Sequence, residues 1–446
     1  MKNHLKVILL TGVAVSFGSS AWGQSSTIES RLRAMEAQIA QLKAELAAEK
    51  AQTDSDLIVL ERKATTIAAP AAATPSSGSG FTAGGTNFKI SGFIDMDAHH
   101  TTMSEGGPFS ANSIARDFYI PSVTPTGDGS AESSSVTDFT AQASRIKIHA
   151  DRGTGADKIT GLFEMDFLGS AQGNQRVSNS YSPRLRRAFV DYKGFRAGQE
   201  WTTFQNLSSI PESASFLALS DGMVFNRQAM LRYTSGPFQI AAENGNATIT
   251  GATGAGRIEA DGNSIPDIIA RYNLKGDYGN ISFAGIGRQL RVENGGIDDE
   301  TFAFGASVSG RVKVGDKDDI RFGLTAGEGL GRYIGLNALN AGAVNPTTGE
   351  IEAIPSYGGH VSWRHPFGDT ARFNVGYSAL FADNPDFLTT LNPASTESVQ
   401  SGYAAVLWDI APKVTLGIEG LHGTKELENG NDGDFTRFTF STKYGF

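Results

Sequence analysis

The segment FTRFTFSTKYGF, residues 435–446, decides the fold class of this chain. Aromatic residues occupy alternate positions in it, and polar or charged residues fill positions between them. The aromatic set is Phe438, Phe440, Tyr444 and Phe446, and the polar set is Arg437, Thr439, Ser441 and Lys443. Because successive side chains of a strand point to opposite faces, this period of two predicts a strand with one aromatic and one polar face.

The same alternation recurs through residues 87–446. In the segment 158–167, for example, Phe163 and Met165 alternate with Glu164 and Asp166. Sixteen segments share this pattern, centred near positions 94, 147, 163, 188, 200, 229, 241, 270, 286, 306, 323, 361, 375, 404, 418 and 440. The pattern therefore predicts an all-β body of 16 strands.

The connections between these segments alternate between long and short. About forty residues (101–142) separate the first two segments, whereas DRGTGAD, residues 151–157, separates the next two. Long connections are expected at 168–183, 205–222, 244–266, 327–356, 382–396 and 422–434. Such alternation is typical of an up-and-down outer-membrane barrel, which has long external loops and short periplasmic turns.

The polar faces of the strands carry charged residues, Arg145 and Lys147 among them. An uncompensated charge in a dry core is costly, so we expect the apolar faces to meet lipid and the polar faces to surround water. This predicts a 16-stranded antiparallel transmembrane β-barrel. The final strand, with Tyr444 and Phe446, is similar to the signal recognised by the barrel-assembly machinery. Interfacial aromatic girdles are expected from Trp201, Tyr233, Tyr272, Trp363, Tyr377, Trp408 and Tyr444.

The N-terminal part of the chain has a different character. A basic start, a short apolar run and small residues at Ala21 and Gly23 predict a signal peptide over residues 1–23. Residues 24–63 are expected to form a short α-helical coiled coil in the periplasm, since apolar residues recur at heptad spacing: Ile28, Leu32, Met35, Ile39, Leu42 and Leu46. Residues 64–86 carry no charge and predict a flexible linker, which leaves residues 87–446 for the barrel.

Composition excludes several functional classes. The 446 residues include no cysteine, which rules out disulfides, thiolate-ligated zinc, iron–sulfur clusters and thiol nucleophiles. The formal net charge of −9 argues against nucleic acid as a partner. His99 and His100 are adjacent and point to opposite sides of a strand, so they cannot chelate one metal together. We expect no metal, no cofactor and no enzymatic activity.

A basic cluster is predicted on the inner faces of the early strands. It comprises Arg145, Lys147, Arg187, Arg196 and Arg232, and the adjacent Arg186 is expected to face outward. Arginine and lysine at a constriction favour anions over cations. The connection 205–222, with Glu212 and Asp221 as its acidic members, is the candidate for narrowing the lumen. Alternatively, these arginines serve only to stiffen the wall by pairing with Glu164, Asp166 or Asp191.

Together, four features resemble the DcaP-like trimeric porins: the short coiled coil, the linker, the first strand FKISGFIDMDAHH (88–100), and SPRLRRAFVDYKGFRAGQEWTTFQNL (182–207) followed by an inserted loop. The resemblance implies a homotrimer that passes small organic anions, including dicarboxylates, through a pore lined by basic residues. It assigns that lining to Arg145, Lys147, Arg187 and Arg196. The loop 205–222 resembles the third loop of trimeric porins, which folds into the lumen.

These observations predict an outer-membrane porin for the passive, selective diffusion of small hydrophilic anions, surrounded by outer-membrane lipid. Two alternatives remain open. The barrel could be a structural anchor whose coiled coil contacts the cell wall, although the sequence offers no plug domain to seal it, since the N-terminal segment is too small and is tethered. It could also be a sugar-specific or phosphate-specific channel, although aromatic residues on the inner faces are sparse.

Overall fold

A computed structural model describes residue 40 and residues 80–446, with the exception of positions 112, 171, 172, 174, 176, 177, 255, 261 and 295. The predicted signal peptide and coiled coil, and most of the predicted linker, lie outside the described residues. Among the described residues, no helix has both the length and the apolar composition that crossing a membrane requires.

The described body is a closed antiparallel barrel of 16 wall strands, as predicted. One wall strand is interrupted and consists of β3 and β4, which pair with the two halves of β2. In order, the wall comprises β2 (Thr86–Met103), β3 (Ser134–Thr140) with β4 (Arg145–Arg152), β5 (Ile159–Asp166), β6 (Arg184–Tyr192), β7 (Phe195–Trp201), β8 (Arg227–Ser235), β9 (Phe238–Glu243), β12 (Asp267–Gly276), β13 (Gly279–Asn294), β14 (Ile297–Val314), β15 (Asp318–Glu328), β18 (Pro355–Phe367), β19 (Ala371–Ala382), β20 (Thr396–Ala411), β21 (Val414–Leu427) and β22 (Asp432–Gly445).

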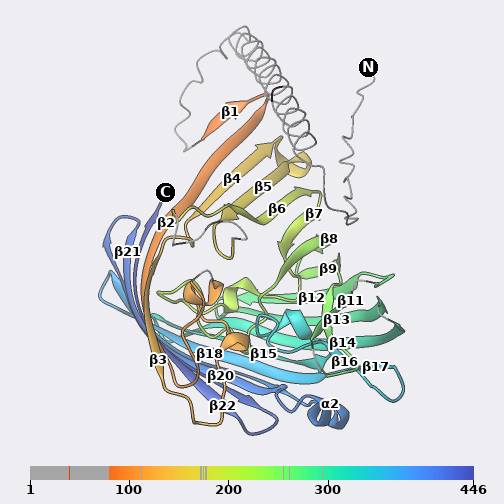
Figure 1. The fold of residues 1–446 in the computed structure, drawn as a ribbon. Coiled ribbons are helices and arrows are strands. Elements are labelled where there is room, and N and C mark those ends of the chain that lie inside the picture. The colour runs from red at the N-terminus through yellow and green to blue at the C-terminus, as the bar shows by residue number, and fades with distance from the viewer. Residues whose placement is uncertain are drawn as a thin grey trace. The chain divides into compact units, whose positions relative to one another are not determined.

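The barrel closes where the last strand meets the first. β22 pairs with β2 from Phe93↔Gly445 to Met103↔Phe435, so blue β22 and orange β2 lie side by side in Figure 1. The backbone N–H of Phe446 donates to the carbonyl of Gly92 at 3.1 Å and extends this seam to the end of the chain. Each of the 16 predicted segment centres falls within a wall strand.

Several predicted boundaries differ from the structure. The expected connection 101–142 contains β3, whose sequence SSVTDFT is too short and too polar to stand out as a strand. The expected linker ends earlier than residue 86, because β1 (Phe81–Ala83) forms a small hairpin with the start of β2. The expected long connection 422–434 is only 428–431, since β21 and β22 extend toward each other.

The two faces of the wall separate as the alternation predicts. Ile94, Phe304 and Phe438 lie on the outer face and are each about 60% exposed. Asp95, Ser307 and Arg437 have the alternate parity on the same strands and are buried, so this face points into the barrel. Trp201 is an exception to the predicted girdle: it is buried and packs edge-on against Phe225, 4.7 Å between ring centroids.

The wall is lower on one side than on the other. We call β6–β9 the short wall, because these strands have only six to nine residues. Further round the barrel, after β12, β13 has 16 residues and β14 has 18. Figure 1 shows this difference between the green and the blue-green strands.

Smaller elements lie in the connections. A four-stranded sheet consists of β10 (Ala247–Thr250), β11 (Arg257–Ala260), β16 (Gly342–Val344) and β17 (Ile351–Ala353). The helical elements are η1 (Ile114–Arg116), η2 (Pro121–Val123), η3 (Gly155–Asp157), η4 (Leu207–Ser209), η5 (Gly331–Tyr333) and α2 (Asp386–Leu391). Buried clusters of apolar residues join the loops to the inner wall. One of them brings Phe204, Leu330 and Tyr333 together with Ile269 of β12.

Candidate functional site

The connection between β7 and β8, residues 202–226, is the central feature of the interior, and we call it the inner loop. Asn206 begins η4 by accepting from the backbone N–H of Ser208, and its amide donates to Asn280 of β13 at 2.7 Å. Further along, the carbonyl of Ile210 accepts from Arg321 of β15 at 2.8 Å. The inner loop therefore runs along the inner face of the opposite strands.

Glu212 is held by two arginines of the far wall. Its carboxylate oxygens accept from Nε of Arg364 at 2.8 Å and from Nε of Arg372 at 2.7 Å. Burial by itself would raise the pKa of Glu212, but Arg372 and Arg364 outweigh it and lower that pKa. Since β18 and β19 lie eight strands away from β6 and β7, the inner loop crosses the barrel as a charged, anchored segment.

Asp221, the other predicted acidic member of this loop, is fully buried. Its carboxylate accepts from the hydroxyl of Tyr119 at 2.8 Å and from the hydroxyl of Ser401 on β20. Burial raises the pKa of Asp221 to about 6, although both hydrogen bonds oppose that shift. Asp221 thus joins two loops and the wall, and does not face open lumen.

Four of the five predicted basic residues form one network with inner-face carboxylates. Arg145 lies 3.8 Å from Glu164 and 3.7 Å from Asp166. Lys147 lies 3.9 Å from Glu164. The remaining pairs are closer: Arg187 with Glu200 (2.6 Å) and Glu164 (3.4 Å), and Arg196 with Asp191 (2.6 Å) and Glu200.

Arg186 was predicted to face outward, and this prediction is wrong. The register between β5 and β6 shifts at Glu164 and Met165, which pair with Arg187 and Leu185, respectively. The extra residue is a β-bulge, and a bulge turns the side chain that alternation would place outside. Arg186 consequently donates to Glu164 at 2.9 Å and to Asp166 at 2.6 Å, with its side chain 2% exposed.

The sequence contains no simple signal for this bulge, but the run RLRR offers one hint. Three arginines within four residues cannot all be placed by strict alternation without sending one into lipid. Arg184 also turns inward and lies 2.8 Å from Asp166. With Arg184 and Arg186 included, six cationic side chains share the four carboxylates of Glu164, Asp166, Asp191 and Glu200.

Arg232, the fifth predicted residue, has a different environment. It pairs across the sheet with Arg196, so two like charges lie directly opposite on β7 and β8. No ion pair involving Arg232 is present in the described part of the chain. Only 7% of the residue is exposed. Arg232 therefore adds a positive charge beside this network, and no carboxylate forms an ion pair with it in the described residues.

Aromatic rings from the inner loop and the wall lie against this network. The guanidinium of Arg145 lies 5.0 Å from the ring of Phe93 and 5.9 Å from that of Phe216. Arg186 lies 5.4 Å from the same Phe216 ring. Cation–π contacts of this kind hold guanidinium planes in place without neutralising them.

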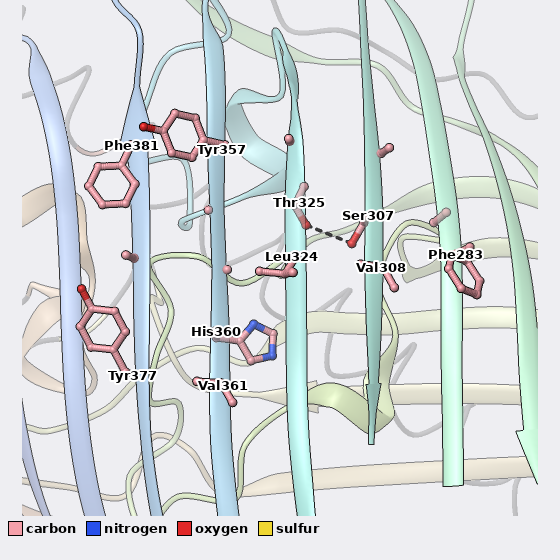
Figure 2. A pocket seen from close by; sticks show the side chains of 16 residues that line it. Phe283, Ser307, Val308, Leu324, Thr325, Tyr357, His360, Val361, Tyr377 and Phe381 are labelled. Atoms are coloured by element: carbon pink, nitrogen blue, oxygen red, sulfur yellow. Dashed lines mark hydrogen bonds between the residues drawn. The ribbon is translucent and has the colours of Figure 1, made fainter. Parts of the chain in front are cut away.

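A hollow of about 820 Å³ lies outside the lumen (Figure 2). Its rim consists of large side chains from the outer face, including Phe283, Leu324, Tyr357 and Phe381. Its floor is thin because Gly358 and Gly359 carry no side chain. An apolar hollow on the outer face of a barrel suits lipid chains, so we do not assign it to a hydrophilic solute.

The predicted assembly signal lies at the seam of the barrel. Tyr444 is on the outer face and 47% exposed, and it pairs with Ile94 of β2. The ring of Phe446 lies over Gly92, where a Cβ atom would be only 2.9 Å from it. Recognition of this strand by assembly machinery stays a prediction.

The sequence matches the family model described as "DcaP outer membrane protein" over residues 63–446. A comparison with curated proteins found no match. Among solved structures, the outer membrane channel DcaP of Acinetobacter baumannii is 22% identical, with a TM-score of 0.69; the match covers 83% of this chain and 100% of that one. The anion-selective porin from Comamonas acidovorans is 10% identical, with a TM-score of 0.50 and coverage of 81% and 100%. The chain belongs to the DcaP outer membrane protein family.

Proposed function

Starting from this family membership, we propose that the protein is an anion-selective channel of the bacterial outer membrane. It passes small hydrophilic organic anions, dicarboxylates among them, by passive diffusion. The observation that carries the proposal is the charge balance on the inner faces of β4 to β8. Six cationic side chains share four carboxylates there, and Arg232 adds a further cation.

The arrangement of the network favours transport over a purely structural role. Arg145 and Lys147 lie 3.7 to 3.9 Å from their carboxylates, beyond hydrogen-bond distance, whereas Arg186 takes the close positions. A cation that is attracted but not bound by its neighbours keeps donors free for a passing anion. Arg186 and Arg184 pair closely with Glu164 and Asp166, so Arg145 and Lys147 can act on solute.

The short wall supports a homotrimer as the working state. A spanning strand needs about 9–11 residues, but β7 has seven and β9 has six. Their outer faces are nevertheless apolar, with Phe195, Leu231 and Ile240 exposed. A wall too low for the bilayer and too apolar for water suits contact with neighbouring subunits.

The proposal is tested by the reversal potential of single channels in a planar bilayer under a salt gradient. We compare wild type with Arg145→Ala/Lys147→Ala. In water, one unit charge interacts with an ion 4 Å away by about 1 kcal/mol, which corresponds to about fivefold in relative permeability. Loss of two positive charges should therefore lower the preference for anions at least severalfold.

The matched control is Arg311→Ala on β14, whose guanidinium is partly exposed and paired with Asp319 at 2.9 Å. It should leave the reversal potential nearly unchanged. A cation-selective wild type would refute anion selectivity while leaving a porin. No conductance from folded trimers would refute the channel and favour the structural anchor.

A further inference from the structure

A second pocket lies on the turn side of the inner loop, and we call it the turn-side pocket. It has a volume of about 680 Å³ and lies between residues 205–208 of the loop and the short-turn ends of the strands. Arg232 of β8 and Arg271 of β12 line it, together with Gln205, Gln239 and Asn273. It is separate from the Arg145 and Lys147 side chains, which do not line it.

Register places Arg232 and Arg271 on either side of one strand. Arg232 pairs with Ala241 of β9, and Arg271 pairs with Gln239 of the same strand. Gln239 lines the pocket beside both arginines. Two cationic groups and the amide of Gln239 therefore share one cavity.

Neither guanidinium has a carboxylate partner. In the described part of the chain, every other arginine lining this pocket is ion-paired: Arg187 with Glu200 and Arg196 with Asp191. Arg271 donates from Nη1 to the carbonyl of Gln205, but its Nε has no partner. A buried guanidinium without an anion is costly, and here two lie close together.

The neutral groups of the pocket are also unsatisfied. Gln205 is 3% exposed, and neither atom of its side-chain amide has a hydrogen-bond partner. The side-chain oxygen of Gln239 likewise has none. Buried polar groups are nearly always paired in a folded protein, so a cluster of unpaired donors and acceptors in one cavity indicates a site for a polar ligand.

We propose that the turn-side pocket is a binding subsite for the carboxylate of a small hydroxylated organic anion. The carboxylate lies between Arg232 and Arg271, and the amides of Gln205 and Gln239 meet the hydroxyl group. The proposal rests on the proposed anion channel. It adds a discrete binding site to that channel, on the side of the inner loop that faces the short turns.

The test is block of the current by malate added to one side at a time. Because the chain has no cysteine, a single Lys317→Cys in the turn 315–317 reports the orientation of each channel through an impermeant thiol reagent. We expect turn-side malate to block wild type at a lower concentration than loop-side malate. Arg232→Gln/Arg271→Gln should raise the turn-side half-blocking concentration about tenfold.

Two further variants separate charge from folding. Gln239→Leu removes an amide of the pocket without changing any charge and should weaken the block in the same direction. Arg311→Gln lies outside the pocket and should leave it unchanged. Equal block in wild type, in the double variant and in Gln239→Leu would overturn the subsite, even if the wild type is anion-selective. A cation-selective wild type would instead overturn the proposed function.

Discussion

At the scale of single residues, side chains of one charge have different tasks in this barrel. Arg186 is buried between Glu164 and Asp166, whereas Arg145 lies near the same two carboxylates without hydrogen-bonding them. Sequence alternation identified Arg145 as inner but placed Arg186 outside, because alternation assumes an unbroken register. A bulge depends on how two strands pair, so the sequence of either strand alone does not predict it.

Replacing Arg186 should destabilise the barrel more than replacing its neighbour. Arg186→Met leaves two buried carboxylates short of a partner, which costs about 3 kcal/mol. Arg184→Met removes a more exposed partner of Asp166 and should cost about 1 kcal/mol or less. Urea unfolding in lipid vesicles measures both, and equal midpoints for the two variants would contradict the assigned role of Arg186.

Asp221 should make stability depend on pH. Its pKa is about 6 in the folded chain, against an ordinary value of 3.8. Below pH 3.8 both the folded and the unfolded chain hold the proton. As pH rises to about 6 only the folded chain retains it, so the contribution of this group to stability falls.

The contribution of Asp221 to the pH dependence of stability is isolated by comparison with Asp221→Asn, whose side chain does not titrate. The stability of wild type relative to this variant should be greater at pH 4 than at pH 7, by roughly 3 kcal/mol at most. Thermal unfolding in detergent at both pH values measures the difference. A constant difference across this range would show that Asp221 keeps its ordinary pKa.

At the scale of elements, the inner loop is positioned by ion pairs that are remote in sequence. Glu212 is 152 positions from Arg364 and 160 from Arg372. A single sequence carries no information that joins such positions, so inward folding was an expectation drawn from resemblance alone. By contrast, the wall strands were predictable, because alternation is local and each strand displays it independently.

Removing the charge of Glu212 should free both arginines. Glu212→Gln leaves Arg364 and Arg372 in the interior with less compensation, so anion preference should increase, by about fivefold or less. The reversal potential measures this change. Asp409→Asn, which removes the other partner of Arg372 at an exposed position, is the control and should have a smaller effect. A shift toward cations in Glu212→Gln would contradict this account.

At the scale of the whole molecule, the uneven height of the wall is the main asymmetry. The number of alternating segments in the sequence predicts 16 strands. It does not predict which of these strands are short, because a strand ends where its hydrogen-bonded neighbour turns away. The pairing of β6 with β7 covers only Ala188–Tyr192 and Phe195–Gln199. Beyond it, the side-chain amide of Gln199 donates to the carbonyls of Leu185 and Arg186.

A bulky apolar residue on the short wall should weaken the homotrimer. Leu231→Trp is tolerable in lipid but enlarges a packed subunit contact, which typically costs 1–3 kcal/mol for each copy. Leu324→Trp on β15, outside the short wall, is the matched control, since Leu324 is similarly exposed. Semi-native electrophoresis measures the temperature at which trimers dissociate. Dissociation at the same temperature in both variants would place the interface elsewhere.

The seam between β2 and β22 has a consequence for biogenesis. The first and last wall strands pair over residues more than 330 positions apart, so the sheet has two open edges until β22 pairs with β2. Open edges of an amphipathic sheet invite pairing with other chains. The unfolded polypeptide must therefore be kept apart from its copies until the barrel closes, and the slowest step of folding is expected to be this closure rather than the formation of any local hairpin.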